Sequence, residues 1–214
     1  MTDPTSSLIA VLLDRSGSME SIRTDMIGGF AAFMDTQRTV PGDVRVTLAQ
    51  FDTEYEVVYA DRPLADVGPL VLQPRGMTAL LDGIGQLTAE IGVGLARLPE
   101  DRRPGSVVVV VITDGLENSS VEYTRDAVAE LIRRQESEYS WTYVFLGANM
   151  DAVAVGASLG FQPTRSLTYA PAAEGVAATY RAAARFVADV RSAPAGAPPP
   201  AGFTEEERSA ARGD

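Results

Sequence analysis

Histidine, lysine and cysteine are all absent from this sequence of 214 residues, and every one of its 18 basic residues is arginine. Without cysteine the chain has no disulfide, no thiolate metal site and no cysteine nucleophile. Without histidine and lysine it has no Ser-His-Asp triad, zinc–histidine site, phosphate-loop lysine or Schiff-base lysine. The remaining chemistry must come from carboxylates, hydroxyls, arginine, the backbone and a bound metal, which excludes most classes of enzyme.

Positive charge is also scarce, and the formal net charge is −11. A general nucleic-acid-binding protein would carry a basic face, and an anionic membrane would repel this chain. The first seven residues contain no basic residue, and the apolar run that follows has only six residues, Leu8–Leu13. That pattern is typical of neither a signal peptide nor a membrane span, so we expect a cytoplasmic protein.

Two wholly apolar runs each end in a carboxylate. Leu8–Leu13 is followed by Asp14, and Val107–Ile112 is followed by Thr113 and Asp114. Runs of this kind suit strands that are buried on both faces in the middle of a parallel sheet. In open α/β sheets, ligands bind at the carboxyl ends of such strands. We therefore expect a binding site where these two strands end.

The rest of the chain alternates between helical and strand patterns. Residues 44–51 and 55–59 predict an antiparallel hairpin at a sheet edge, because the connection between them is too short for a parallel crossover. The helix that begins near Thr78 contains four glycines and is expected to be broken or kinked. Further elements are predicted at residues 22–34, 121–135, 151–159 and 172–190 (helices) and at 141–146 and 166–169 (strands).

This alternation predicts an α/β fold with a doubly wound, mostly parallel central sheet, one antiparallel edge strand and helices on both faces. Residues 1–191 are expected to form one domain. Residues 192–214 are expected to be a linker rich in proline, alanine and glycine, followed by an acidic, flexible C-terminal tail.

Asp14, Ser16, Ser18, Thr78 and Asp114 are the candidate metal ligands. If the two apolar strands are neighbours where the strand order reverses, Asp14 and Asp114 open onto one crevice, and Thr78 begins a helix that can reach it. Two carboxylates with three hydroxyls suit Mg²⁺, which prefers octahedral oxygen ligands, with Mn²⁺ or Ca²⁺ as substitutes. Zinc and copper have little to attract them without histidine or cysteine.

Three segments together resemble the von Willebrand factor type A domain family: Asp14-Arg-Ser16-Gly-Ser18, Gly76-Met-Thr78 and Thr113-Asp114-Gly115. The resemblance covers roughly residues 7–190. It implies a metal-ion-dependent adhesion site (MIDAS), in which the hydroxyls of Ser16, Ser18 and Thr78 bind Mg²⁺ and the carboxylates of Asp14 and Asp114 hold it directly or through water. It also implies binding to an acidic residue, Glu or Asp, of a partner protein. Lacking a signal sequence and disulfides, the chain looks like a small intracellular bacterial-type member.

Each segment also has a simpler interpretation, since Asp, Ser and Thr after a strand commonly cap helices or form turns. Glu117, Asn118 and Ser119, and likewise Asn149 and Asp151, are interpreted as polar loop residues near the crevice. The leading hypothesis is a non-enzymatic, metal-dependent protein-binding module. The alternatives are metal-assisted phosphoryl transfer or hydrolysis, with Arg15 or Arg75 facing the phosphate, and an accessory subunit of an ATPase or chelatase-type complex. The sequence leaves the oligomeric state open.

Overall fold

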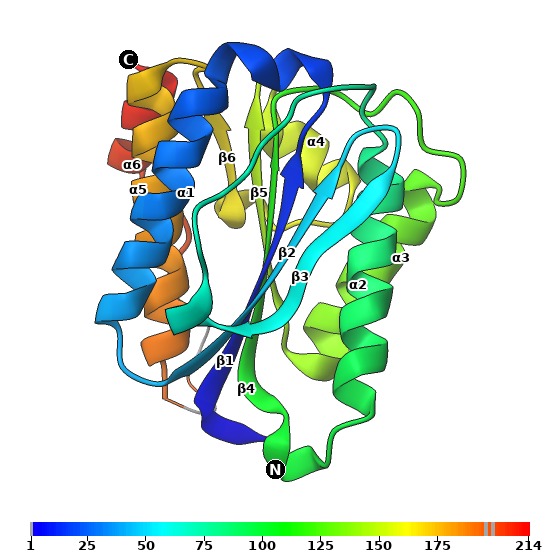
Figure 1. Ribbon diagram of the computed structural model, residues 1–214, viewed down its shortest axis with the longest axis vertical. Helices are drawn as coiled ribbons and strands as arrows, with labels where there is room; N and C mark the ends of the chain where they lie inside the picture. The colour runs from blue at the N-terminus through cyan, green and yellow to red at the C-terminus, as the bar shows by residue number, and fades with distance from the viewer. Residues whose placement is uncertain (1, 195–196, 198–199) are drawn as a thin grey trace.

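In the computed structural model, which describes residues 2–194, 197 and 200–214, a six-stranded sheet lies between two layers of helices (Figure 1). The strands are β1 (Asp3–Asp14), β2 (Asp43–Phe51), β3 (Tyr55–Pro63), β4 (Pro104–Thr113), β5 (Thr142–Ala148) and β6 (Ser166–Tyr169). The α-helices are α1 (Arg23–Thr39), α2 (Leu80–Ala96), α3 (Arg125–Tyr139), α4 (Ala152–Ser158), α5 (Ala173–Ser192) and α6 (Glu205–Arg212). Short 3-10 helices are η1 (Gly17–Ile22), η2 (Leu64–Asp66), η3 (Glu100–Arg102) and η4 (Pro163–Arg165).

The strand order is β3-β2-β1-β4-β5-β6. All neighbouring strands are parallel except β2 and β3, which form the antiparallel hairpin at one edge. The order reverses between β1 and β4, the two strands that the apolar runs predicted as the central pair. The predicted fold class is therefore confirmed, including the antiparallel edge strand.

Both faces of the central strands are buried, as their unbroken apolar sequence requires. In β1, Ile9, Val11 and Leu13 belong to the core on the side of α1 and α5. The alternate β1 residues Leu8, Ala10 and Leu12 belong to the core on the side of α2 and α3. Figure 1 shows these helix pairs on opposite sides of the sheet.

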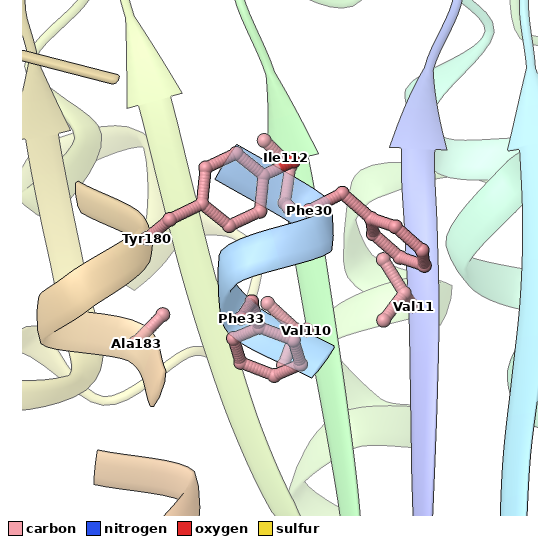
Figure 2. Close-up of a pocket in the computed structure, with 7 residues that line it drawn as sticks. All are labelled: Val11, Phe30, Phe33, Val110, Ile112, Tyr180 and Ala183. Carbon is pink, nitrogen blue, oxygen red and sulfur yellow. The ribbon is translucent and has the colours of Figure 1, made fainter. Parts of the chain in front are cut away.

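The core between the sheet and helices α1 and α5 is closely packed (Figure 2). Phe30 and Phe33 of α1 meet Tyr180 of α5 above the central strands, and the gap that they enclose is too small for a water molecule. Gly29 allows this approach, because an added Cβ there would lie 2.1 Å from a ring carbon of Tyr180.

Two helices differ from the sequence-based prediction. Helix α2 is continuous from Leu80 to Ala96, so its glycines do not break it. Helix α3 begins at Arg125 rather than near residue 121, because the Thr124 side chain caps it by accepting a hydrogen bond from the backbone N–H of Ala127. The residues just before this cap are held instead by a side chain of α2, described below.

Residues 203–214, where the sequence predicts a flexible tail, pack against the domain, and part of the predicted linker lies outside the described residues. Helix α6 packs on α5 and β6, and Phe203 and Ala211 are buried. Arg208 donates hydrogen bonds to the backbone oxygen of Ser166 in β6 and to those of two residues just before it. The apolar and backbone contacts of this segment outweigh its acidic composition. Within the described part of the chain, no helix is both long enough and apolar enough to cross a bilayer.

Candidate functional site

The carboxyl ends of β1 and β4 meet at the centre of the sheet, where the strand order reverses. β1 ends at Asp14 and β4 ends at Thr113, and the two strands pair in one continuous register from Ser7 and Ser106 to Leu13 and Ile112. The loops that follow, residues 15–18 and 114–123, therefore emerge side by side. The candidate site lies between these loops and the N-terminus of α2.

Asp14 lies at the base of the site and is fully buried. One carboxylate oxygen accepts a hydrogen bond from the backbone N–H of Ser16 at 2.6 Å, and the other accepts one from the Thr113 hydroxyl at 2.6 Å. Burial raises the pKa of Asp14 to about 6, although both hydrogen bonds favour the ionised form. This carboxylate is thus fixed in orientation but poorly solvated.

Ser16, Ser18 and Asp114 continue the site across the β1–β4 boundary. The hydroxyl oxygens of Ser16 and Ser18 lie 3.1 Å apart, and the Ser18 hydroxyl donates a hydrogen bond to Asp114 Oδ1 at 2.6 Å. Burial raises the pKa of Asp114 above its ordinary value, and the bond from Ser18 opposes that rise. The first and third sequence segments are therefore in direct contact.

Thr78 brings the second segment to the same place. Its backbone N–H donates to Asn118 Oδ1 at 2.8 Å, and the N–H of Asn118 donates to the Thr78 carbonyl at 3.0 Å. A Cβ added to Gly115 would lie 3.4 Å from Thr78 Oγ1 and 3.8 Å from Ser18 Oγ. Both hydroxyls therefore lie beside Gly115, next to Asp114. The structure brings all of the candidate ligands together.

Asp52, a residue that sequence reasoning missed, ties the loop that follows β1 to the segment that leads into α2. Its carboxylate accepts hydrogen bonds from Arg15 Nε and Arg75 Nε, each at 2.8 Å. Its carbonyl accepts one from the backbone N–H of Ala79 at 2.8 Å. Burial alone would raise the pKa of Asp52, but the bonds from Arg75 and from the backbone of Glu54 hold it below its ordinary value. Asp52 thus stays ionised as an anchor for these loops.

Glu117 and Asp82 tie the loop that follows β4 to helix α2. The interpretation of Glu117 and Asn118 as ordinary polar loop residues is therefore wrong. The Glu117 carboxylate accepts a hydrogen bond from the backbone N–H of Leu81 at 2.9 Å. Asp82 is buried and accepts bonds from the backbone N–H groups of residues 121, 122 and 123 at 2.8–2.9 Å. These carboxylates fix the loop that carries Asp114 relative to the helix that follows Thr78.

Two further polar residues of the crevice have structural roles. The Asn149 side-chain amide donates to the Asp114 carbonyl at 3.2 Å. Asp151 caps α4 by accepting hydrogen bonds from the backbone N–H groups of Val153 and Ala154. Asn149 thus supports the Asp114 backbone, whereas Asp151 serves its own helix, as a polar loop residue often does.

Solved structures with the same arrangement of strands and helices decide the fold. A von Willebrand factor type A protein from Catenulispora acidiphila matches with a TM-score of 0.54 and 16% identity, over 85% of this chain and 42% of that one. This chain has the von Willebrand factor type A fold. The type A domain of the pilus tip protein Mfa5 from Porphyromonas gingivalis matches with a TM-score of 0.59 and 11% identity, over 85% of this chain and 94% of that one.

Another type A match is proximal thread matrix protein 1 from the mussel byssus, described with a zinc-occupied MIDAS motif. It aligns with a TM-score of 0.58 and 14% identity, over 87% of this chain and 47% of that one. The chain spans less than half the length of the mussel and Catenulispora proteins. No protein-family model matches the sequence, and no curated protein matches it. At these identities the similarity establishes the type A fold, and the chemistry of the site rests on its own residues.

Proposed function

We propose that this chain is a metal-dependent protein-binding module. In this proposal Asp14, Ser16, Ser18, Thr78 and Asp114 hold Mg²⁺, and a Glu or Asp side chain of a partner protein completes the coordination. The observation that carries the proposal is the convergence of two buried carboxylates and three hydroxyls from three separate loops at the sheet's reversal point.

The residues fit a hard divalent cation. Burial disfavours the charged form of both Asp14 and Asp114, and a bound cation would compensate that penalty. Among the described residues, no group of three or more acidic, histidine or cysteine side chains is arranged to hold a metal. The donor set instead combines two carboxylates with three hydroxyls, which suits Mg²⁺ with retained water better than it suits zinc or copper.

The charge of the site supports an acidic partner group. Asp14 and Asp114 together roughly balance a dication, and the hydroxyls of Ser16, Ser18 and Thr78 add no charge. When bound, the cation supplies an electrophilic position for a partner carboxylate oxygen. A third or fourth acid in the site would have weakened that attraction.

Binding is favoured over turnover by the placement of the arginines. Arg15 and Arg75, the candidates for neutralising a phosphate, both donate to Asp52. Arg15 is also buried and paired with Glu56. Their guanidinium groups hold loops in place, so we propose a non-enzymatic role. The absence of cysteine supports an intracellular setting as part of this proposal.

Calorimetry and thermal unfolding in Mg²⁺, Mn²⁺, Ca²⁺ and EDTA test the metal site. At a free Mg²⁺ concentration of 100 times the Kd, the ion should stabilise the fold by about 2.7 kcal/mol. Asp14→Ala should abolish this gain. Asp126→Ala, which removes an exposed acid from the first turn of α3, should retain it. Equal stability of the unmodified protein in Mg²⁺ and EDTA would refute the metal site.

Affinity purification from the native host, with Mg²⁺ or EDTA, tests the partner. Proteins captured by the unmodified chain in Mg²⁺ should be lost in EDTA and with Asp14→Ala. An ATPase among them would favour the accessory-subunit alternative. Capture that is indifferent to both changes would contradict metal-dependent binding.

A further inference from the structure

A pocket of about 230 Å³ opens between the tip of the β2–β3 hairpin, the first turns of α2 and residues 121–122. It is adjacent to the candidate metal site but distinct from it. Ala79, which lines the pocket, directly follows Thr78, and the Thr53 hydroxyl in its wall accepts a hydrogen bond from the backbone N–H of Met77 at 3.0 Å. A partner segment bound at Thr78 would therefore lie close to the pocket.

The pocket combines an apolar wall with an acidic mouth. Tyr55, which is partly exposed, and Val121, which is 91% exposed, supply apolar surface, and the buried Phe51 and Ala79 back the wall. This volume is below the roughly 300–1,000 Å³ of typical small-molecule sites. It is suited to one long side chain rather than to a whole cofactor.

The acidic groups at the mouth have little positive charge to balance them. Glu54 has a side chain that is 77% exposed, and its paired cation is Arg75 at 3.5 Å, whose Nε already donates to Asp52. Glu122 accepts a hydrogen bond from the neutral amide of Gln86 at 2.8 Å. The pocket therefore presents net negative charge at its entrance.

The third acid of the pocket, Asp82, is not free to bind a cation. Both of its oxygens accept hydrogen bonds from backbone N–H groups of residues 121–123. Its remaining effect is to add negative potential at the base of the pocket. A metal ion would find only the two exposed carboxylates, whereas a basic side chain would also use the apolar wall.

We infer that this pocket binds a lysine or arginine side chain of the protein partner whose carboxylate approaches the metal site; the inference rests on the proposed function. The methylene stem of that side chain would lie against Tyr55 and Val121, and its charged head would lie between Glu54 and Glu122. The partner segment thus carries an acidic and a basic residue close together in sequence. The basic residue also offsets repulsion between an acidic segment and a chain of net charge −11.

Selection of random linear peptides displayed on phage, in Mg²⁺ with the full-length chain as bait, tests this inference. We expect enrichment of peptides with an acid and, within a few residues, a lysine or arginine. Repeating the selection with Glu54→Gln/Glu122→Gln should retain the acid and lose the basic preference. Both positions are exposed, so this variant should fold normally.

A selected peptide then gives a quantitative test by calorimetry in Mg²⁺. The double Gln variant should bind it about 3- to 10-fold more weakly, as expected for partly solvated charge pairs. Replacing the basic residue of the peptide by Met should weaken binding to the unmodified chain by a similar factor and should not weaken binding to the variant further. Glu130→Gln, an exposed acid of α3 paired with Arg133, is the matched control and should leave the affinity unchanged.

The possible failures can be told apart. The selected peptides could share an acidic residue but no basic one, or the Met substitution in the peptide could weaken binding equally to the unmodified chain and to the double Gln variant. Either result would overturn the basic subsite and leave the proposed function standing. Selection of basic peptides that bind equally in EDTA would show that the pocket acts without the metal site and would also overturn the joint site. If no peptide binds in an Mg²⁺-dependent manner, the proposed function falls and this inference falls with it.

Discussion

At the scale of single residues, Asp14 shows a conflict between stability and the proposed function. Its side chain is fully buried between β1 and β4, with the Thr113 hydroxyl and the Ser16 N–H as its hydrogen-bond partners. Burial raises its pKa from 3.8 to about 6. A pKa difference of this size corresponds to roughly 3 kcal/mol of penalty on the ionised form. The metal-free fold therefore carries an unfavourable charge at neutral pH.

Asp14→Asn is expected to stabilise the metal-free protein at pH 7.5 while abolishing its response to Mg²⁺. The gain should be about 1–2 kcal/mol, because the amide removes the charge but keeps only one of the two acceptor oxygens. The Thr113 hydroxyl can still donate to the Gly115 carbonyl, to which it lies at 3.0 Å. Urea unfolding in EDTA measures the difference.

The pH dependence gives a second readout of the same substitution. The folded-state pKa of Asp14 is raised, so its penalty is absent below about pH 3.8, grows between pH 3.8 and 6 and is complete above pH 6. The advantage of Asp14→Asn in EDTA should therefore shrink as the pH falls through this window. A variant less stable than the unmodified chain at pH 7.5 would contradict the assigned cause.

Sequence reasoning identified the candidate ligands that the structure brings together but missed the residues that position them. Asp14 and Asp114 were predictable because each directly follows a long apolar strand. The carboxylates of Asp52, Asp82 and Glu117 accept hydrogen bonds from arginines or from backbone N–H groups. These donors lie in loops that are distant in sequence or that carry no recognisable motif. No local pattern predicts such contacts, because they depend on how the loops meet after the sheet has formed.

At the scale of elements, some glycines of α1 and α2 lie against a side chain of another element, and others face open space. In α2, Gly83 and Gly85 lie against the rings of Phe51 and Tyr123, whereas a Cβ on Gly92 would meet nothing within 4 Å. Propensity alone predicts a broken helix, but tertiary packing of one face outweighs the roughly 1 kcal/mol intrinsic cost of each glycine. This explains why the predicted break in α2 is absent.

The neighbouring glycines of α1 provide a matched pair for testing this view. Gly28→Ala should stabilise the protein by about 0.5–1 kcal/mol, because an added Cβ has open space and alanine favours the helix. Gly29→Ala should destabilise it by about 1–3 kcal/mol, because the Cβ would lie 2.1 Å from the buried Tyr180 ring. Chemical denaturation of both variants measures the contrast. Equal effects would show that α1 and α5 do not pack as described.

At the scale of the whole molecule, the sheet topology was predictable and the C-terminal docking was not. Apolar runs and hydrophobic periodicity identified the strands, and the short connection between residues 51 and 55 identified the antiparallel edge, since both signals are local in sequence. Residues 203–214 are held by sparse contacts, among them Arg185 to Glu207 and the rings of Phe186 and Phe203, which lie 5.8 Å apart. A proline-rich, acidic segment gives no signal for such contacts in advance.

Phe203→Ala tests whether this segment belongs to the folded unit. Loss of a buried phenylalanine side chain should lower the free energy of unfolding by about 3 kcal/mol. Glu206→Ala, at an exposed position of α6 just after Phe203, should change it by less than about 0.5 kcal/mol. Urea unfolding of both proteins provides the comparison. A C-terminal segment that contributes nothing to stability would leave the two variants equal.

The contact between Ser18 and Asp114 joins residues 96 positions apart, across the boundary between β1 and β4. During synthesis, the first half of this site leaves the ribosome long before the second. Pairing of β1 with β4 must also close a long loop, and non-local contacts of this kind slow folding. A nascent or half-folded chain therefore cannot display a complete site. Under the proposed function, binding would therefore require that β1 and β4 have already joined.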